Sequence, residues 1–196
     1  LKRKLVRHKR QDFFFKASAR TNLVLQNSGM TSATDYTEDT LFDGRIRCLQ
    51  HRQGYRFSVD AVLLGNFIQP KPGDRILDLG CGCGIIPLIL AYRWPKLSIT
   101  GLEIQPNLTS LARKNVELND FSRNIYPVRK AVSDASGEIE FFVSRNRKAL
   151  YLEHQLGGSS SAGRARDAYS EQVRVETVSL DEFVDEEGVS RVDIMK

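Results

Sequence analysis

The sequence predicts an α/β protein, a three-layer sandwich with a mostly parallel central sheet. Short apolar segments alternate with helix-length segments between residues 75 and 119, as in consecutive βα units. A glycine-rich turn separates the first strand from the first helix, at the place where α/β sheets bind cofactors. With 196 residues, 41% of them hydrophobic, the chain can bury a sizeable core in one domain.

The first βα unit follows a turn at residues 71–74, Lys-Pro-Gly-Asp. Residues 75–79 are short and apolar and predict a buried strand. Residues 85–92 have the length of a helix, and Pro87 fits there because it falls in the first turn. The glycines between the two elements permit positive φ and leave bare backbone beside a helix N-terminus. The unit therefore predicts a cofactor site.

The spacing of these glycines separates the site from two common nucleotide motifs. Gly80, Gly82 and Gly84 follow the acidic residue Asp78. The dinucleotide fingerprint G-x-G-x-x-G would need glycine at position 85, which is Ile85. No Gly-Lys-Ser/Thr follows, so the phosphate-binding P-loop is excluded as well.

The second βα unit places an acidic residue at the end of its strand. Residues 97–104 are apolar and β-branched, and Glu103 follows the apolar part. A carboxylate at this position can accept hydrogen bonds from both ribose hydroxyls of an adenosine. Residues 108–119 predict the following helix, whose apolar stripe is Leu108, Leu111, Ala112 and Val116.

The stretch "LDLGCGCG" resembles D/E-x-G-x-G-x-G, the first motif of the class I S-adenosylmethionine (SAM) methyltransferases. This resemblance implies a Rossmann-like methyltransferase fold with SAM as cofactor. The cofactor-binding residues that it implies in and after the two strands are Asp78, Gly80, Cys81, Gly82, Gly84 and Glu103. A Rossmann-like unit with a different nucleotide site is the alternative.

The segment ahead of this core predicts a hairpin and a helix. Asp43-Gly44 is a hairpin turn signal. Residues 58–67 predict a helix with Ser58 as N-cap. We expect the apolar side of this helix to face the core; its apolar residues are Val59, Val62, Leu63 and Phe67.

Residues 37–119 resemble the bacterial tRNA adenine amino-methyltransferases that modify the anticodon loop of a valine tRNA. The resemblance includes Gln50, Gly54, Tyr55, Arg56, Phe57 and Asp60. It implies that Phe57 and Asp60 contact the cofactor, whereas the alternative is that Tyr55, Phe57 and Leu63 pack the helix on the sheet. The N-P-P-Y motif of that family does not occur in this sequence, where the one proline after Asn119 is Pro127.

Residues 74–196 resemble the FkbM-type methyltransferases, which methylate hydroxyl oxygens of sugars and secondary metabolites. Residues 125–144 predict a strand, a Ser-Gly turn and an alternating strand, and residues 173–196 predict a strand, a short acidic helix and a strand. The matching stretches are 131–134 (AVSD), 180–183 (LDEF) and 192–196 (VDIMK).

The predicted function is SAM-dependent methylation, with an FkbM-like hydroxyl acceptor first and a tRNA adenine amino group second. A non-catalytic SAM- or RNA-binding fragment is the third hypothesis. The expected partner is accordingly a hydroxylated small molecule or a tRNA. His154 is a candidate general base, but a single His in a polar loop is usually solvated, so no catalytic residue is assigned.

The expected organisation has three parts. Residues 1–29 predict a disordered or non-native extension, because they show no periodicity and Met30 begins a stretch that reads like a natural start. Residues 1–20 hold eight Lys and Arg against one Asp, a net +7. Residues 30–72 carry the hairpin and helix, and residues 73–196 form the SAM-binding core, with a flexible insert at 144–170 near the substrate. We expect this core to be truncated, because class I methyltransferase sheets have seven strands and the sequence predicts four of them.

The chemistry of the remaining residues favours a cytoplasmic protein. Cys48, Cys81 and Cys83 have neither disulfide-rich nor zinc spacing, so we expect no metal and a reduced environment, with two cysteines as small fillers of the glycine loop. The sequence contains no apolar run of 18 residues and no apolar signal-peptide core.

Overall fold

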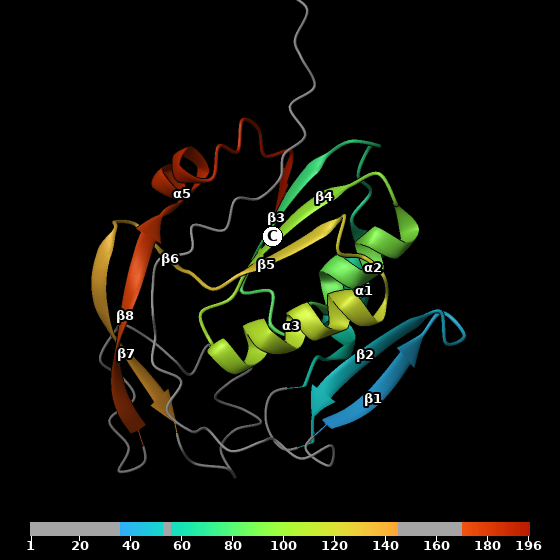
Figure 1. The fold of residues 1–196 in the computed structure, drawn as a ribbon, viewed down its shortest axis with the longest axis horizontal. Helices are drawn as coiled ribbons and strands as arrows, with labels where there is room; N and C mark the ends of the chain where they lie inside the picture. Colours follow the sequence, from blue (N-terminus) through green and yellow to red (C-terminus); the bar gives the residue numbers. More distant parts are fainter. Residues whose placement is uncertain (1–35, 53–55, 145–169) are drawn as a thin grey trace, which may run out of the picture. The chain divides into compact units, whose positions relative to one another are not determined.

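A four-stranded parallel sheet with the order β5-β4-β3-β9 forms the centre of the structure (Figure 1). The computed structural model describes residues 36–52, 56–144 and 170–196. The central strands are β3 (Arg75–Leu79), β4 (Ser98–Leu102), β5 (Ile125–Val128) and β9 (Ile194–Met195). The strand order confirms the Rossmann-like α/β fold predicted from the sequence.

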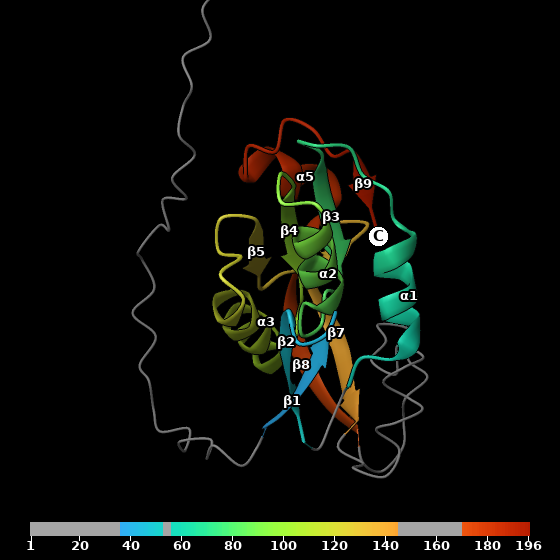
Figure 2. The same cartoon turned by 90° about the vertical axis from the view of Figure 1, so that its right-hand side faces the viewer.

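Three helices cover one face of this sheet, as Figure 2 shows. They are α1 (Val59–Phe67), α2 (Ile85–Arg93) and α3 (Pro106–Leu118). Alternate residues of the strands face this layer, so that Ile76, Ile99 and Ile125 share a core with α2 and α3. α2 is buried along most of its length, which explains why its sequence is almost entirely apolar.

The opposite face of the sheet carries a smaller apolar cluster. Leu77 and Leu102 point to this side and contact Phe183, which is fully buried. Phe183 lies on α5 (Leu180–Glu186), where Ser179 caps the helix by accepting a hydrogen bond from the Glu182 N–H at 3.2 Å. The predicted short acidic helix is thus confirmed, and it covers the second face of the sheet.

A separate three-stranded sheet with the order β6-β8-β7 lies between β5 and α5 in sequence. Its strands are β6 (Ala131–Ser133), β7 (Gly137–Ser144) and β8 (Ser170–Ser179). β7 and β8 pair antiparallel over their length, from Gly137 opposite Thr177 to Ser144 opposite Ser170. The chain therefore leaves the main sheet after β5 and returns to it only at β9.

The predicted hairpin is present as β1 (Tyr36–Leu41) and β2 (Ile46–His51). Its turn contains Asp43 and Gly44, both with positive φ. Asn119 at the end of α3 fixes the hairpin to the core, because its side chain accepts from the Arg47 N–H at 2.9 Å and donates to the Arg47 carbonyl at 2.7 Å.

The orientation expected for α1 is wrong for three of its four apolar residues. Val59, Leu63 and Phe67 are 67%, 62% and 82% exposed, whereas Val62 packs against the main core. Ser58, although at the N-cap position, makes no capping hydrogen bond. The helix instead turns its Gly65 side to α2, where a Cβ on Gly65 would lie 3.1 Å from the Ile89 side chain. Because α1 is apolar on both sides, its apolar periodicity does not determine which side is buried. The close packing of Gly65 against Ile89 determines it.

Two predicted segments fall largely outside the described residues. The extension at residues 1–29 lies wholly outside them, and the insert at 144–170 contributes only its end residues to β7 and β8. The division of the chain into these parts stays a prediction.

Replacing Gly65 with Leu should destabilise the protein, because the added side chain has no room against Ile89. We expect a loss of about 1–3 kcal/mol in the free energy of unfolding, as for overpacked cores. The control is Leu63→Gln on the exposed side of the helix, with an expected change within about 0.5 kcal/mol. Urea unfolding measures both, and a larger loss for Leu63→Gln would mean that the other face of α1 is the packed one.

Candidate cofactor site

The glycine loop joins β3 to α2 at the carboxyl end of the parallel strands. Gly80, Gly82 and Gly84 all have positive φ, at 72°, 57° and 86°. A Cβ on Gly80 would meet nothing within 4 Å, so the backbone there borders open space. The amides of Gly80 and Cys81 donate to the Leu102 carbonyl at 2.8 and 3.0 Å, which ties the loop to β4.

Glu103 fastens the middle of the loop. Its side chain is 6% exposed, and its carboxylate accepts from the Gly82 N–H at 3.0 Å and from the Gln105 N–H at 2.8 Å. Burial raises the pKa of the Glu103 carboxyl, and the hydrogen bonds from backbone N–H groups partly offset this rise. Each carboxylate oxygen has further lone pairs, so the group can bind the loop and still accept a ligand hydroxyl.

Asp78, the acidic residue at the start of the motif, is almost fully buried at the end of β3. Burial raises the pKa of its carboxyl, and the Lys196 ammonium, 3.0 Å from Oδ1, opposes that rise. Lys196 thus forms an ion pair with Oδ1, while Oδ2 has no hydrogen-bond partner. Asp78 therefore keeps unused acceptor capacity beside the loop.

Lys196 is a site residue that the motif analysis missed. Its Nζ lies 3.4 Å from the carbonyl oxygens of both Leu79 and Gly80, in addition to Asp78. The parallel pairing of β9 with β3 brings Lys196 here, across more than a hundred residues of sequence. The sequence did contain a signal for this contact. Lys196 directly follows an apolar strand, and a cation at such a position can neutralise a buried acid on the neighbouring strand.

A hollow of about 240 Å³ lies beside the loop. It is lined by the start of α1, the loop, the start of α2 and Lys196, namely Ser58, Asp60, Ala61, Leu64, Gly80, Cys81, Cys83, Ile85, Ile86 and Lys196. Asp60 lines the same hollow as Gly80 and Cys81, while its contact with the cofactor stays a prediction. Phe57 is not among the lining residues; it packs against the main core, and its N–H donates to Gln50 Oε1 at 2.8 Å.

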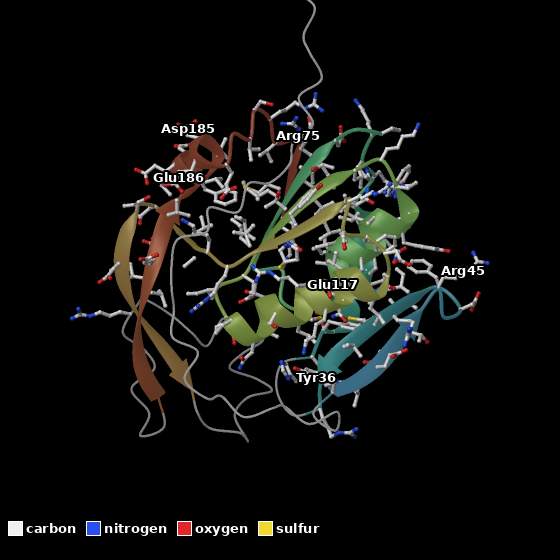
Figure 3. The ribbon with its side chains drawn as sticks, in the orientation of Figure 1. Tyr36, Arg45, Arg75, Glu117, Asp185 and Glu186 are labelled. Carbon is white, nitrogen blue, oxygen red and sulfur yellow. The ribbon has the colours of Figure 1, made fainter. Side chains whose placement is uncertain are left out.

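A second hollow, of about 320 Å³, lies at the carboxyl ends of β4 and β5. Ile104, directly after Glu103, lines it together with Arg129, Lys130, Ala131, Arg174, Val175 and Glu176. Lys130 pairs with Glu186 at 3.5 Å, one of the two acidic residues labelled on α5 in Figure 3. Sequence reasoning missed this hollow because β8 reaches it only through the additional sheet.

The described ranges contain no group of three or more His, Cys, Asp and Glu side chains placed to hold a metal ion. Within the same ranges, no helix is both long and apolar enough to pass through a lipid bilayer.

Residues 58–144 match the family described as "Methyltransferase small domain". The match covers α1, the glycine loop, Glu103 and the strands up to β7. It includes every predicted cofactor residue except Phe57, which directly precedes it.

Curated relatives include the tRNA1(Val) (adenine(37)-N6)-methyltransferases of Yersinia pestis strain Pestoides F and of Yersinia pseudotuberculosis serotype O:1b. Each is 37% identical over 92 residues, which is 46% of this chain and 35% of the relative. The chain thus spans about a third of the length of these relatives.

Solved structures with partial overlap include a SAM-dependent methyltransferase from Thiobacillus denitrificans in complex with S-adenosyl-L-homocysteine. It is 24% identical, covers 43% of this chain and 36% of its own, and has a TM-score of 0.35. A SAM-dependent methyltransferase from Agrobacterium tumefaciens is 15% identical over 57% of this chain and 36% of its own, with a TM-score of 0.39.

These findings support the general class, while the FkbM resemblance of residues 74–196 stays a prediction. The parallel sheet, the glycine loop after Asp78 and the family match lead to the same assignment. Residues 58–144, less than half of the chain, are thus similar to the methyltransferase small domain family.

Proposed function

We propose that the chain transfers a methyl group from SAM, which it holds at the glycine loop. The observation that carries this proposal is the pair of buried carboxylates on either side of the loop, Asp78 at the end of β3 and Glu103 after β4. A cofactor with a ribose diol and a cationic amino acid needs acceptors at two such places.

The residues fit this cofactor. The Asp78 carboxylate is 1% exposed and pairs with Lys196 through Oδ1, while its Oδ2 has no hydrogen-bond partner and can accept a hydrogen bond from a ligand. The space beside Gly80 is open to the 240 Å³ hollow. We assign the methionine part of SAM to this hollow, the ribose to Glu103, and the adenine to the side of Ile104.

The bound cofactor would supply an electrophilic methyl group on a cationic sulfonium. The chain's own part is to bind and orient, since in-line methyl transfer gains much of its rate from positioning. Glu103 and the Asp78–Lys196 pair offer acceptor oxygens beside the loop to the ammonium and hydroxyl donors of the ligand. The loop backbone, fixed by Glu103 and by the Leu102 carbonyl, sets the direction of approach.

For the acceptor we propose an adenine amino group in tRNA. The support is the 37% identity over 92 residues with enzymes of that name, together with the basic rim formed by Arg129, Lys130 and Arg174. RNA phosphates are attracted to such a rim. This order reverses the one expected from the sequence, where a hydroxyl acceptor came first.

A hydroxyl acceptor is the second candidate, and two observations favour it. The additional strands β6, β7 and β8, followed by α5 and β9, occur in the order that the FkbM resemblance predicts. The sequence also contains no N-P-P-Y stretch to accept hydrogen bonds from an adenine amino group.

Replacing Glu103 with Ala should weaken binding of S-adenosylhomocysteine, because it removes a charge-assisted acceptor and the anchor of Gly82. The expected loss is about 1.5–3 kcal/mol, or roughly 10- to 150-fold in Kd. Glu117→Ala is the matched control, because Glu117 is exposed on α3 (Figure 3). Calorimetry measures both variants, and equal affinity of Glu103→Ala and wild type would contradict the ribose assignment.

Replacing Lys196 with Met should destabilise the protein at neutral pH, because it leaves the Asp78 charge buried without its ion pair. The loss should stay below the roughly 3–5 kcal/mol of a fully buried pair, since the Lys196 side chain is 27% exposed. Burial raises the Asp78 pKa above its unfolded value, so the variant should regain stability as the pH falls through that raised pKa and the carboxyl is protonated.

The control for this pH dependence is Lys130→Met, which breaks a pair 33% and 58% exposed at 3.5 Å. Exposed pairs contribute about 0–1 kcal/mol. Thermal unfolding from pH 4 to pH 8 gives both curves, and a pH-independent loss for Lys196→Met would show that Asp78 is not its partner.

The acceptor is decided by methyl transfer from labelled SAM to unmodified tRNA and, separately, to hydroxylated sugars. We expect N6-methyladenosine in the nuclease digest of the tRNA. A tRNA with inosine in place of the target adenosine is the control, because it lacks the amino group. Label on a sugar oxygen and none on tRNA would replace the first candidate with the second.

A further inference from the structure

Two thiols from distant parts of the sequence meet behind the glycine loop. Cys48 lies on β2 and Cys83 lies between the second and third loop glycines, with the two Sγ atoms 3.9 Å apart. Both side chains are buried, at 0% and 2% exposed. The sequence predicted Cys81 and Cys83 as small fillers of the loop. It did not predict that Cys48 of the hairpin contacts Cys83, because this contact depends on the fold.

Asn115 of α3 holds the two segments in this position. It is fully buried, and its Oδ1 accepts from the Leu49 N–H at 2.7 Å. Its Nδ2 lies 3.0 Å from the Leu49 carbonyl, 2.9 Å from the Cys83 carbonyl and 3.5 Å from Cys48 Sγ. One side chain therefore fixes both the strand that carries Cys48 and the loop that carries Cys83.

Cys83 is the more nucleophilic thiol of the two. The contact with Cys48 lowers the pKa of Cys83, and the Ile85 N–H at the start of α2 acts in the same direction against burial. The pKa of Cys48 is raised, by the same contact and by burial. Cys83 also lines the 240 Å³ hollow beside the loop, through which a small oxidant can reach it.

We propose that Cys48 and Cys83 are a redox-active pair, which a peroxide converts to a disulfide that ties the β1–β2 hairpin to the glycine loop and weakens cofactor binding. The effect on the cofactor rests on the proposed function, whereas the disulfide itself does not.

The reaction balances with one peroxide. The Cys83 thiolate attacks a peroxide oxygen, the O–O bond breaks, and a sulfenic acid and hydroxide form, the hydroxide taking up the thiol proton as water. The Cys48 sulfur then attacks the sulfenic sulfur, an S–S bond replaces the S–O bond, and the oxygen leaves as a second water. Two thiols lose two electrons in total, and the peroxide is reduced.

Closing the bond must move the loop. A disulfide has an S–S distance of about 2.03–2.05 Å, so the two Sγ atoms must approach by about 1.9 Å from their present 3.9 Å. Gly82 and Gly84 flank Cys83 and give that segment the freedom to shift. The shift draws Cys83 from the hollow toward β2, and Gly82, held by Glu103, must adjust with it.

Cys81 provides a control within the same loop. It also lines the hollow and is buried, but it packs against β4, where a Cβ on Gly101 would lie 2.8 Å from its Sγ. Burial raises the pKa of the Cys81 thiol well above its usual value. It should therefore take no part in the disulfide.

The test compares wild type, Cys48→Ala and Cys81→Ala before and after hydrogen peroxide, with free thiols then blocked by N-ethylmaleimide. Peptide mass spectrometry should find a Cys48–Cys83 cross-link in wild type and Cys81→Ala. Calorimetry with S-adenosylhomocysteine should show affinity about ten-fold weaker after oxidation, restored by dithiothreitol. Cys48→Ala should show neither change, and each variant is compared only with its own reduced form.

Absence of the Cys48–Cys83 cross-link, or its replacement by one through Cys81, would overturn the pair. A cross-link formed without loss of affinity would overturn its effect on the cofactor. If the reduced protein bound no S-adenosylhomocysteine, the proposed function would fail, while the cross-link found by mass spectrometry would still decide the pair. Cys48→Ser is a second variant in case Cys48→Ala does not fold.

Discussion

The hydrogen bond from the Gly82 amide to the Glu103 carboxylate, 3.0 Å long, gives the cofactor loop its shape. A loop with three glycines at positive φ has little of its own to hold one conformation. Its fixed points come from other segments: the Leu102 carbonyl at the end of β4, Glu103 directly after β4, and Asn115 on α3. The site is therefore a property of the second βα unit as much as of the glycine motif.

Local signals predicted the elements that carry this site. The strand at residues 75–79 was predicted at its observed bounds, and the glycines have the positive φ that their spacing implied. The position of Glu103 after β4 could be predicted for the same reason, because a strand, a turn and a helix in succession fix which side chain stands at the sheet edge.

Contacts that depend on distant segments could not be predicted in this way. Lys196 reaches Asp78 only because β9 pairs with β3, and Cys48 reaches Cys83 only because the hairpin packs on α3. The predicted orientation of α1 was wrong for another reason. A helix with two apolar sides has no preferred buried face until Gly65 packs against Ile89. Periodicity measures the contrast between faces, and here there was little contrast.

Cofactor and acceptor place different demands on a methyltransferase. In the binding mode that we propose, backbone and two carboxylates at the ends of adjacent strands hold SAM, and such a site can be shared by enzymes with different acceptors. An adenine nitrogen must have its lone pair oriented, whereas a hydroxyl must lose a proton. Two features add to the alternating βα units of this chain: the β6-β8-β7 sheet and the basic rim. Both border the second hollow.

The contact between Gly101 and Cys81 has a consequence for how this sequence can vary. A Cβ on Gly101 would lie 2.8 Å from Cys81 Sγ and 3.0 Å from its Cβ, too close for either atom. Any side chain at position 101 would push the residue at position 81 toward the hollow. Positions 101 and 81 thus share the same space. A residue larger than glycine at position 101 becomes acceptable only together with a residue smaller than cysteine at position 81.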